Sequence, residues 1–252
     1  DNALNLDGAT AICPLLKTCM TLKELYLHNT GLGPFGGTFI AEALLEACQT
    51  GRASGTPYTL ERFVLGRSRM ETSGMKLADA LAAIGTLVEV QIPQNGFDDE
   101  SIVALFKACA CNPNLEILNL SDNHGGHFQG GRAAARALKA CTKLRVVKVN
   151  DLTFGEKGGL ALAQGLIDGC PLLEILDAMN NNLTPKVGKA MVGLSGKTRL
   201  RWANLHCNEF GDEALETLIQ ALGDRTPATD SSEEYEDYYD SDEEEEPNDG
   251  DH

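Results

Sequence analysis

A leucine pattern that returns every 27–29 residues constrains the fold of this chain more than any other feature. The pattern reads L-x-x-L-x-L-x-x-N-x-L with substitutions, and one clear copy contains Leu115, Leu118, Leu120 and Asn123. Seven copies start at residues 22, 60, 87, 115, 144, 173 and 200. This period and pattern are typical of a leucine-rich-repeat solenoid, in which each unit buries its apolar residues against its neighbours. Because solenoids usually work as binding surfaces, the pattern favours a binding protein over an enzyme.

The length of the repeats predicts what each unit contains. Units of 27–29 residues leave room for a full α-helix, whereas units of about 20–24 residues hold only an extended or 3₁₀ segment. Helical periodicity is visible, for example in Ile40, Ala43, Leu44 and Ala47. We therefore predict an α/β solenoid with a parallel inner sheet and outer helices. The asparagine of the motif is expected to pair backbone groups that are freed where the chain turns out of each strand.

The domain organisation follows from the positions of the repeats. We expect a repeat domain over residues 1–223, with a partial repeat ahead of the seven complete ones, because Asn2 and Leu4 fit the end of the motif. That partial repeat predicts further repeats upstream of Asp1. The step from residue 22 to residue 60 is 38 residues long, and its Gly-, Ser- and Pro-rich segment Thr50–Tyr58 predicts a loop at the end of the first complete helix.

The end of the chain is strongly acidic. Residues 224–252 hold 14 Asp and Glu residues and a single Arg, whereas the whole chain has a net charge of −16. The last 22 residues contain no aliphatic side chain, so we predict a disordered acidic tail. Two roles remain open for it: keeping the protein in solution, or electrostatic steering of a basic partner.

Cysteine positions and hydropathy indicate an intracellular protein with no membrane span. Cys19, Cys141 and Cys170 each lie three residues before a repeat start, which is typical of small packing residues rather than disulfides. No run of about 18 apolar residues is present.

Two motifs that suggest chemistry are explained better by the repeats. Residues 31–36 match G-x-G-x-x-G, but the next strand region lacks the acidic residue that a ribose would need. Cys109 and Cys111 lie two apart on a predicted helix and would face different directions, which argues against zinc. We expect no metal, no cofactor and no nucleic-acid partner.

The loops that follow the strands should all lie on one rim of the crescent, where binding residues are common. Asn29 lies one position before the asparagine slot, so the turn is not expected to need it, and Arg67 and Arg69 flank a slot. The candidate partner-binding residues on this rim are His28, Asn29, Arg67, Arg69, Gln94, Asn95 and Asp122.

The same loops carry a family resemblance. Residues 22–34 (LKELYLHNTGLGP), the long helix with its insertion, residues 65–71 (LGRSRME) and residues 88–96 (VEVQIPQNG) resemble, in this order, the Ran GTPase-activating protein family. The acidic C-terminal tail is a further similarity. The resemblance implies a ribonuclease-inhibitor-like repeat fold, the GTP form of the small GTPase Ran as partner, and Ran-binding proteins as further partners. It also implies a cytoplasmic protein in nucleocytoplasmic transport, with the nuclear envelope as an alternative location.

The resemblance implies a regulator rather than an enzyme in its own right, because GTP and Mg²⁺ belong to the GTPase. Asn29 matches a family asparagine that helps to order the GTPase's own catalytic glutamine and switch region. A family arginine would fall upstream of Asp1, and Arg67 and Arg69 do not match it. Chain 1–252 alone is therefore expected to be nearly inactive as an activator.

Two other classes remain open. One is a non-catalytic acidic scaffold for basic proteins such as histones, although scaffolds of that kind have shorter repeats. The other is a generic ribonuclease-inhibitor-like interaction protein that binds through the concave face, where Ile117, Val146, Ile175 and Trp202 share one strand position.

Overall fold

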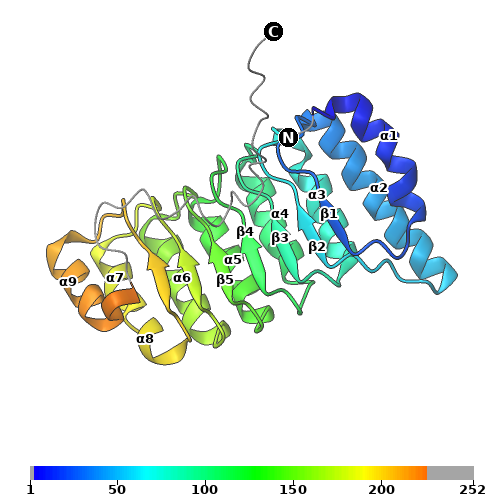
Figure 1. Cartoon of the computed structure of the whole chain (residues 1–252). Coiled ribbons are helices and arrows are strands. Elements are labelled where there is room, and N and C mark those ends of the chain that lie inside the picture. Colours follow the sequence, from blue (N-terminus) through cyan, green and yellow to red (C-terminus); the bar gives the residue numbers. More distant parts are fainter. Residues whose placement is uncertain (1–2, 226–252) are drawn as a thin grey trace, which may run out of the picture.

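A computed structural model describes residues 3–225 of the chain as a single curved array of strand and helix units, drawn in Figure 1. Seven three-residue strands form one parallel sheet whose order follows the sequence. The strands are β1 (Glu24–Tyr26), β2 (Arg62–Val64), β3 (Glu89–Gln91), β4 (Ile117–Asn119), β5 (Val146–Lys148), β6 (Ile175–Asp177) and β7 (Trp202–Asn204). Each strand begins two residues after one of the seven repeat starts, which confirms the predicted solenoid.

Helices cover one face of this sheet and leave the other face open (Figure 1). They are α1 (Asn5–Thr18), α2 (Gly33–Ser54), α3 (Gly74–Ile84), α4 (Asp99–Cys109), α5 (His127–Ala140), α6 (Gly155–Gly169), α7 (Pro185–Met191), α8 (Leu194–Lys197) and α9 (Gly211–Leu222). Two short 3₁₀ helices, η1 (Glu71–Ser73) and η2 (Gly223–Arg225), complete the described elements. No helix within residues 3–225 is long and apolar enough to cross a membrane.

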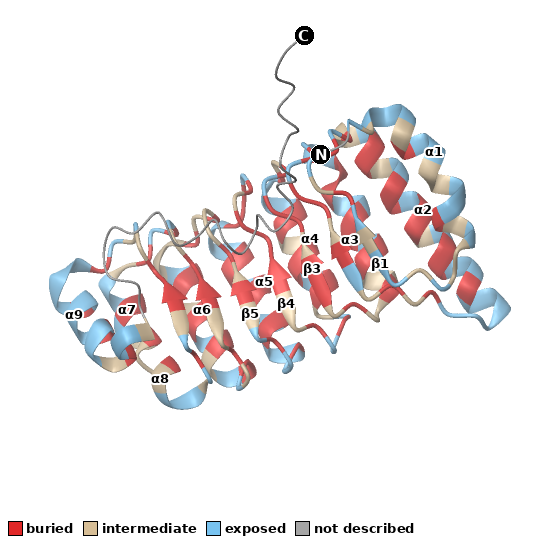
Figure 2. Cartoon of the chain, viewed as in Figure 1, coloured by how far each residue is buried: buried red, intermediate tan, exposed pale blue. Residues whose placement is uncertain are grey.

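The core lies between the sheet and the helices, as the buried residues in Figure 2 show. The motif leucines are its main component, and Leu60, Leu87, Leu115 and Leu118 are fully buried. Each strand is paired in register with the next, so equivalent leucines stack from unit to unit. This stacking explains why a sequence with a constant repeat length folds into a regular solenoid.

The motif asparagines form a buried ladder at the end of the strands, as predicted. Asn123 Oδ1 accepts hydrogen bonds from the backbone N–H groups of Asn95 (3.1 Å) and Phe97 (3.2 Å), and its Nδ2 donates to Leu120 O (2.8 Å). Asn181 makes equivalent bonds to Leu152 N and Val149 O. Each amide therefore pairs backbone groups of its own repeat and of the preceding one.

The insertion prediction was partly wrong. Residues Thr50–Ser54 continue α2, and the loop begins at Gly55, whose φ of 71° ends the helix in the left-handed region. The extra helical turn is held by tertiary contact, because Arg52 Nη2 donates to Ala83 O of α3 (2.7 Å). A local excess of Gly and Ser could not reveal this bond.

Both ends of the chain lie partly outside the described residues. Asp1 and Asn2 are among those left undescribed, and α1 packs against α2 as the helix of the partial first repeat. The predicted tail began at residue 224, but Asp224 and Arg225 belong to η2, where Arg225 Nη1 approaches Ser195 O at 3.5 Å. The rest of the predicted tail, residues 226–252, lies outside the described residues, so the domain boundary stays a prediction.

The eight cysteines all lie within the described residues and are free thiols. Cys141 and Cys170 are fully buried, as expected of packing residues, while Cys19 is half-buried. Burial raises the pKa of Cys141 to about 11 and that of Cys170 to about 12, so both are protonated at neutral pH. Residues 3–225 hold no group of three or more His, Cys, Asp or Glu side chains suited to a metal ion.

Glycines set the spacing between α5 and α6. A Cβ added at Gly131 would lie 2.5 Å from Gly158 Cα, a backbone atom that cannot rotate away. We expect Gly131→Ala to lower the unfolding free energy by about 1–3 kcal/mol through overpacking. Gly196→Ala is the control, because no atom lies within 4 Å of its added Cβ. Chemical denaturation should show a lower midpoint for Gly131→Ala only, and equal midpoints for the two variants would contradict this account.

Candidate functional site

The turns after the seven strands form one rim of the crescent, and one position in each turn has an unusual backbone. This position directly precedes the asparagine slot and has a φ between 51° and 57°, in the left-handed region that few non-glycine residues adopt. Its occupants are Asn29, Arg67, Gln94, Asp122, Asp151, Asn180 and Cys207. The residue that follows it in the slot turns inward; this is an asparagine in four of the turns and Thr30, Ser68 or Leu152 in the others.

Five of these residues form a second, outer ladder of side chains. Arg67 Nε donates to Gln94 Oε1 (2.7 Å), and Gln94 Nε2 donates to Asp122 Oδ2 (3.4 Å). A side-chain hydrogen bond joins Asp122 to Asp151, and Asn180 Nδ2 donates to Asp151 Oδ1. The rim therefore presents a connected polar row across five repeats.

Asp122, in the centre of this ladder, holds its proton more tightly than an ordinary aspartate. Burial is the main cause and raises the pKa of Asp122 to about 6, with further contributions from the hydrogen bond and charge of Asp151 and from the charge of Asp177. Asp177 is also buried, its pKa is raised by burial, and its Oδ1 has no hydrogen-bond partner among the described residues. Negative charge is thus concentrated in the middle of the rim.

A cavity of about 680 Å³ lies at the N-terminal end of the same rim. Its walls come from the start of α1 and from two rim turns, and its lining residues are Ala3, Asn5, Asn29, Thr30, Gly31, Gly33, Pro34, Arg67, Arg69 and Glu71. The exposed residues Asn29, Arg67 and Arg69 all line it, and with Asn5 and Glu71 the cavity offers two amides and two guanidinium groups against a single carboxylate.

The two arginines differ in how firmly they are held. Arg67 is tied to Gln94 in the outer ladder, whereas Arg69 makes no hydrogen bond or ion pair with any residue in the described part of the chain. Both have left-handed backbones, at φ 54° and 52°. Arg69 is therefore the cation at the cavity that is available to an incoming acidic group.

The structure places the predicted partner-binding residues in three groups. Asn29, Arg67 and Arg69 line the cavity, while Gln94 and Asp122 continue along the outer ladder. His28 is half-buried beside Gly66, and burial together with the charge of Arg67 lowers its pKa, which keeps the ring neutral at pH 7.

Two sequence-based expectations need correction. Asn95 is only 1% exposed, and its amide is used by Ser68 N and Leu65 O in the inner ladder, so it is not available to a partner. The turn at Asn29 also depends on the type of residue at this position, because a φ of 52° favours asparagine over most residues. Asp151 and Glu71 were missed, although Asp151 holds the same repeat position as Asn29 and Asp122.

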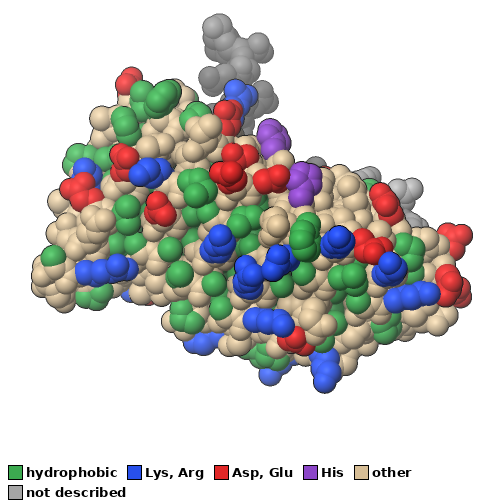
Figure 3. Space-filling view, turned by 180° about the vertical axis from the view of Figure 1, so that it is seen from behind, with side chains coloured by type: hydrophobic (Ala, Val, Ile, Leu, Met, Phe, Trp, Pro, Cys, Tyr) green, Lys and Arg blue, Asp and Glu red, His purple; other side chains and the backbone are tan. Residues whose placement is uncertain are grey.

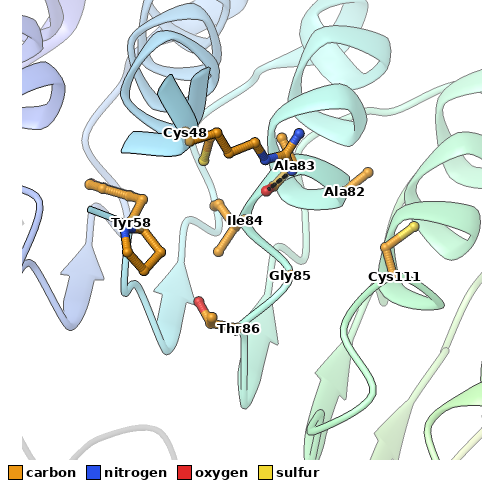
Figure 4. Close-up of a pocket in the computed structure, with 10 residues that line it drawn as sticks. Cys48, Tyr58, Ala82, Ala83, Ile84, Gly85, Thr86 and Cys111 are labelled. Carbon is orange, nitrogen blue, oxygen red and sulfur yellow. Dashed lines mark hydrogen bonds between the residues drawn. The ribbon is translucent and has the colours of Figure 1, made fainter. Parts of the chain in front are cut away.

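A second hollow, of about 270 Å³, lies at the opposite edge of the repeats and is shown in Figure 4. Cys48 and Arg52 of α2, Tyr58 of the insertion loop, the end of α3 and Cys111 line it. The Tyr58 hydroxyl is buried without a hydrogen-bond partner among the described residues, and burial raises the pKa of Tyr58 and of Cys48. None of the predicted site residues is here, and the raised pKa of Cys48 leaves its thiol little reactivity, so the rim is the better candidate.

The chain is similar in sequence to several known proteins. The chain is 46% identical over 101 residues to Ran GTPase-activating protein 1 of Xenopus laevis, a match that covers 39% of this chain and 17% of that protein. It is 31% identical over 226 residues to a Ran GTPase-activating protein of Drosophila melanogaster, covering 88% of this chain and 38% of that protein. It is also 24% identical over 226 residues to the ribonuclease inhibitor of Sus scrofa, covering 88% and 47%. No family model matches the chain.

The parallel sheet, the outer helices and the asparagine ladder define a leucine-rich-repeat protein of the ribonuclease-inhibitor type. Within that class, the chain is similar to Ran GTPase-activating proteins. It spans only 17% and 38% of the length of the two relatives from Xenopus laevis and Drosophila melanogaster.

The raised pKa of Asp122 predicts a dependence of stability on pH. A folded-state pKa above the unfolded value stabilises the protein at low pH, and this stabilisation is lost as the pH rises through about 6. Asp122→Asn removes the ionisable group and keeps a side chain that suits the left-handed backbone. We expect the variant to gain about 1 kcal/mol relative to wild type between about pH 5 and about pH 8, with allowance for solvent screening.

The control for this measurement is Asp168→Asn. The hydrogen bond from Lys139 lowers the pKa of Asp168, so this group is ionised throughout the same pH range. Chemical denaturation at several pH values should give a constant difference between Asp168→Asn and wild type. A constant difference for Asp122→Asn as well would show that the pKa of Asp122 is not raised in the folded protein.

Proposed function

We propose that this protein binds the GTP form of the small GTPase Ran through the rim and accelerates its GTP hydrolysis. The observation that carries the proposal is the cavity lined by Asn29, Arg67 and Arg69, on a chain whose relatives are named Ran GTPase-activating proteins. In this role the protein is a regulator of a partner's active site. GTP and Mg²⁺ come with the GTPase, and this chain supplies no cofactor of its own.

The chemistry of the rim suits positioning better than proton transfer. Asn29 carries a neutral amide that can donate and accept hydrogen bonds at once, which suits the orientation of a glutamine side chain on the partner. Activation of about 10⁵-fold corresponds to about 7 kcal/mol of barrier. Orientation and electrostatic stabilisation can supply an effect of this size without a nucleophile or base from the activator.

The residues of the rim have separate parts in this proposal. Arg67, Gln94 and Asp122 form a row held by mutual hydrogen bonds, which presents a pre-formed surface to the GTPase. Arg69, which has no such bond among the described residues, pairs with an acidic group of the partner. His28 stands neutral behind this row and contributes through packing and hydrogen bonding.

The setting of this activity is part of the same proposal. A Ran activator in the cytoplasm or at the nuclear envelope would support nucleocytoplasmic transport, with Ran-binding proteins as additional partners. The net charge of −16 disfavours nucleic acid as a ligand.

A second candidate function rests on the concave face. Ile117, Val146, Ile175 and Trp202 are aligned across β4 to β7 and are all half-buried, so they form an apolar row on the open side of the sheet. A generic interaction protein, or a scaffold for basic proteins such as histones, would use this row or the acidic tail. Substitution of Trp202 by Ala would then weaken binding of a partner on the concave face. Binding of a partner on the rim should not change.

The proposed function predicts the effect of Asn29→Ala. We expect the rate of Ran-bound GTP hydrolysis at saturation to fall by about 10²–10³-fold, because one positioning group is lost. The measurement is single-turnover hydrolysis, made with chain 1–252 and with a longer form of the protein.

Asn180→Ala is the matched control. Asn180 is also an asparagine at the left-handed rim position, with a φ of 51°, but it lies five repeats further on. Both substitutions should therefore cost similar stability, which thermal melts of the two variants can verify, while only Asn29→Ala should lose activation. If Asn29→Ala keeps more than about a third of the wild-type rate, the positioning role is wrong. Absence of stimulation by the longer wild-type form would reject the function itself.

A further inference from the structure

Three large hydrophobic side chains are exposed next to the rim cavity. Phe35 is 73% exposed, more than any other large hydrophobic residue in the described part of the chain, and Leu6 and Phe39 are 41% and 39% exposed. We name these three residues the apolar lip. Figure 3 shows hydrophobic side chains at the end of the molecule formed by α1 and α2 as well as along the rest of the visible face.

The lip is continuous with the cavity. Phe35 directly follows Pro34, and Leu6 directly follows Asn5, both of which line the cavity wall. Asn5 N donates to Thr30 O (3.1 Å), which fixes the start of α1 against the rim turn. Phe39 lies one turn beyond Phe35 on the same side of α2.

Folding does not account for the exposure of Phe35. The inward face of α2 is formed by other residues, among them Ile40, Leu44 and Ala47, which are fully buried. Small residues bring α2 close to α1 at one point, since a Cβ at Gly36 would lie 3.3 Å from Ala9 Cβ. Phe35 therefore contributes little to either packing surface, and its ring faces solvent beside Arg69's cavity.

We propose that the apolar lip is part of the docking surface for the GTPase and that an apolar side chain of the GTPase, next to an acidic group that reaches Arg69, covers Phe35. This inference rests on the proposed function and adds a contact that the rim residues alone do not supply. Aromatic residues and arginines are among the side chains most enriched in positions that dominate binding energy. Here Phe35 directly follows Pro34, which lines the same cavity as Arg67 and Arg69.

The small exposed area of the apolar lip limits which partner can cover it. Three partly exposed side chains present far less than the roughly 800 Å² that each partner buries in a stable interface, so the lip cannot hold a separate protein by itself. It can extend a contact that already covers the adjoining cavity. A second copy of this chain is a poorer occupant, because a two-fold contact at the lip would bring Arg67 and Arg69 close to their own symmetry copies.

The test is the affinity of Phe35→Ala for Ran loaded with a non-hydrolysable GTP analogue, measured by calorimetry with chain 1–252. We expect the Kd to rise by about tenfold or more, while the hydrolysis rate at saturation, measured with the longer form, stays within about twofold of wild type. This split between binding and rate distinguishes the lip from Asn29, whose loss should lower the saturated rate.

Phe128→Ala is the matched control. Phe128 is a 38% exposed phenylalanine near the start of α5, away from the cavity, with the Arg132 guanidinium 5.5 Å from its ring centre. We expect its Kd to stay within about twofold of wild type, and thermal melts should show that both variants are folded.

The outcomes separate this inference from the proposed function. If wild type binds and Phe35→Ala binds equally well, the lip is not a contact and the inference is overturned, while the proposed function stands. If wild type sediments as a dimer and Phe35→Ala sediments as a monomer, a second copy of this chain covers the lip. The inference is then again overturned. If wild type and the longer form fail to bind or stimulate Ran, the proposed function fails and the inference fails with it.

Discussion

The buried asparagine ladder is the interaction on which the rest of the structure depends. A three-residue strand leaves backbone groups unpaired as soon as the chain turns away from the sheet, and such groups are costly when buried. Asn123 pairs these groups in its own turn and in the turn of the preceding repeat. One amide thus fixes both the shape of a turn and the registration of two units. The same bond recurs at Asn95, Asn181 and Asn208. Together with the parallel pairing of all seven strands, it brings the strand ends to a single edge and so creates the rim.

The rim site follows from the same constraint. Because the slot residue turns inward, the residue before it is forced into the left-handed region and its side chain joins the outer row. Arg67, Gln94 and Asp122 become neighbours although they lie 27 and 28 residues apart in sequence. A surface built in this way is set by the solenoid and needs no closure on binding, which lowers the entropic cost of meeting a partner. The cavity and the apolar lip occupy the end of this row.

The site carries a cost in stability. Non-glycine residues with positive φ recur along the rim, and Asp122, Asp151 and Asp177 concentrate negative charge where burial already disfavours it. Strained backbone and unfavourable charge are common where function, rather than folding, determines the sequence. The inner asparagine ladder and the stacked leucines hold the turns in place by many contacts. The fold therefore tolerates the positive-φ backbone and the concentrated negative charge at the rim.

The sequence by itself determined the repeat, the helix in each unit, the parallel sheet and the position of the loops on one rim, because a constant period of leucines and asparagines can be satisfied only by regular stacking. It also indicated Asn29, Arg67 and Arg69, which the structure brings to one cavity. Tertiary structure alone decided that Asn95 is buried, that α2 extends to Ser54, and that Asp122 shares a hydrogen bond with Asp151. It also decided that Phe35 stands exposed beside the cavity. These features depend on contacts between neighbouring repeats, whose side chains meet only after each unit has stacked on the next.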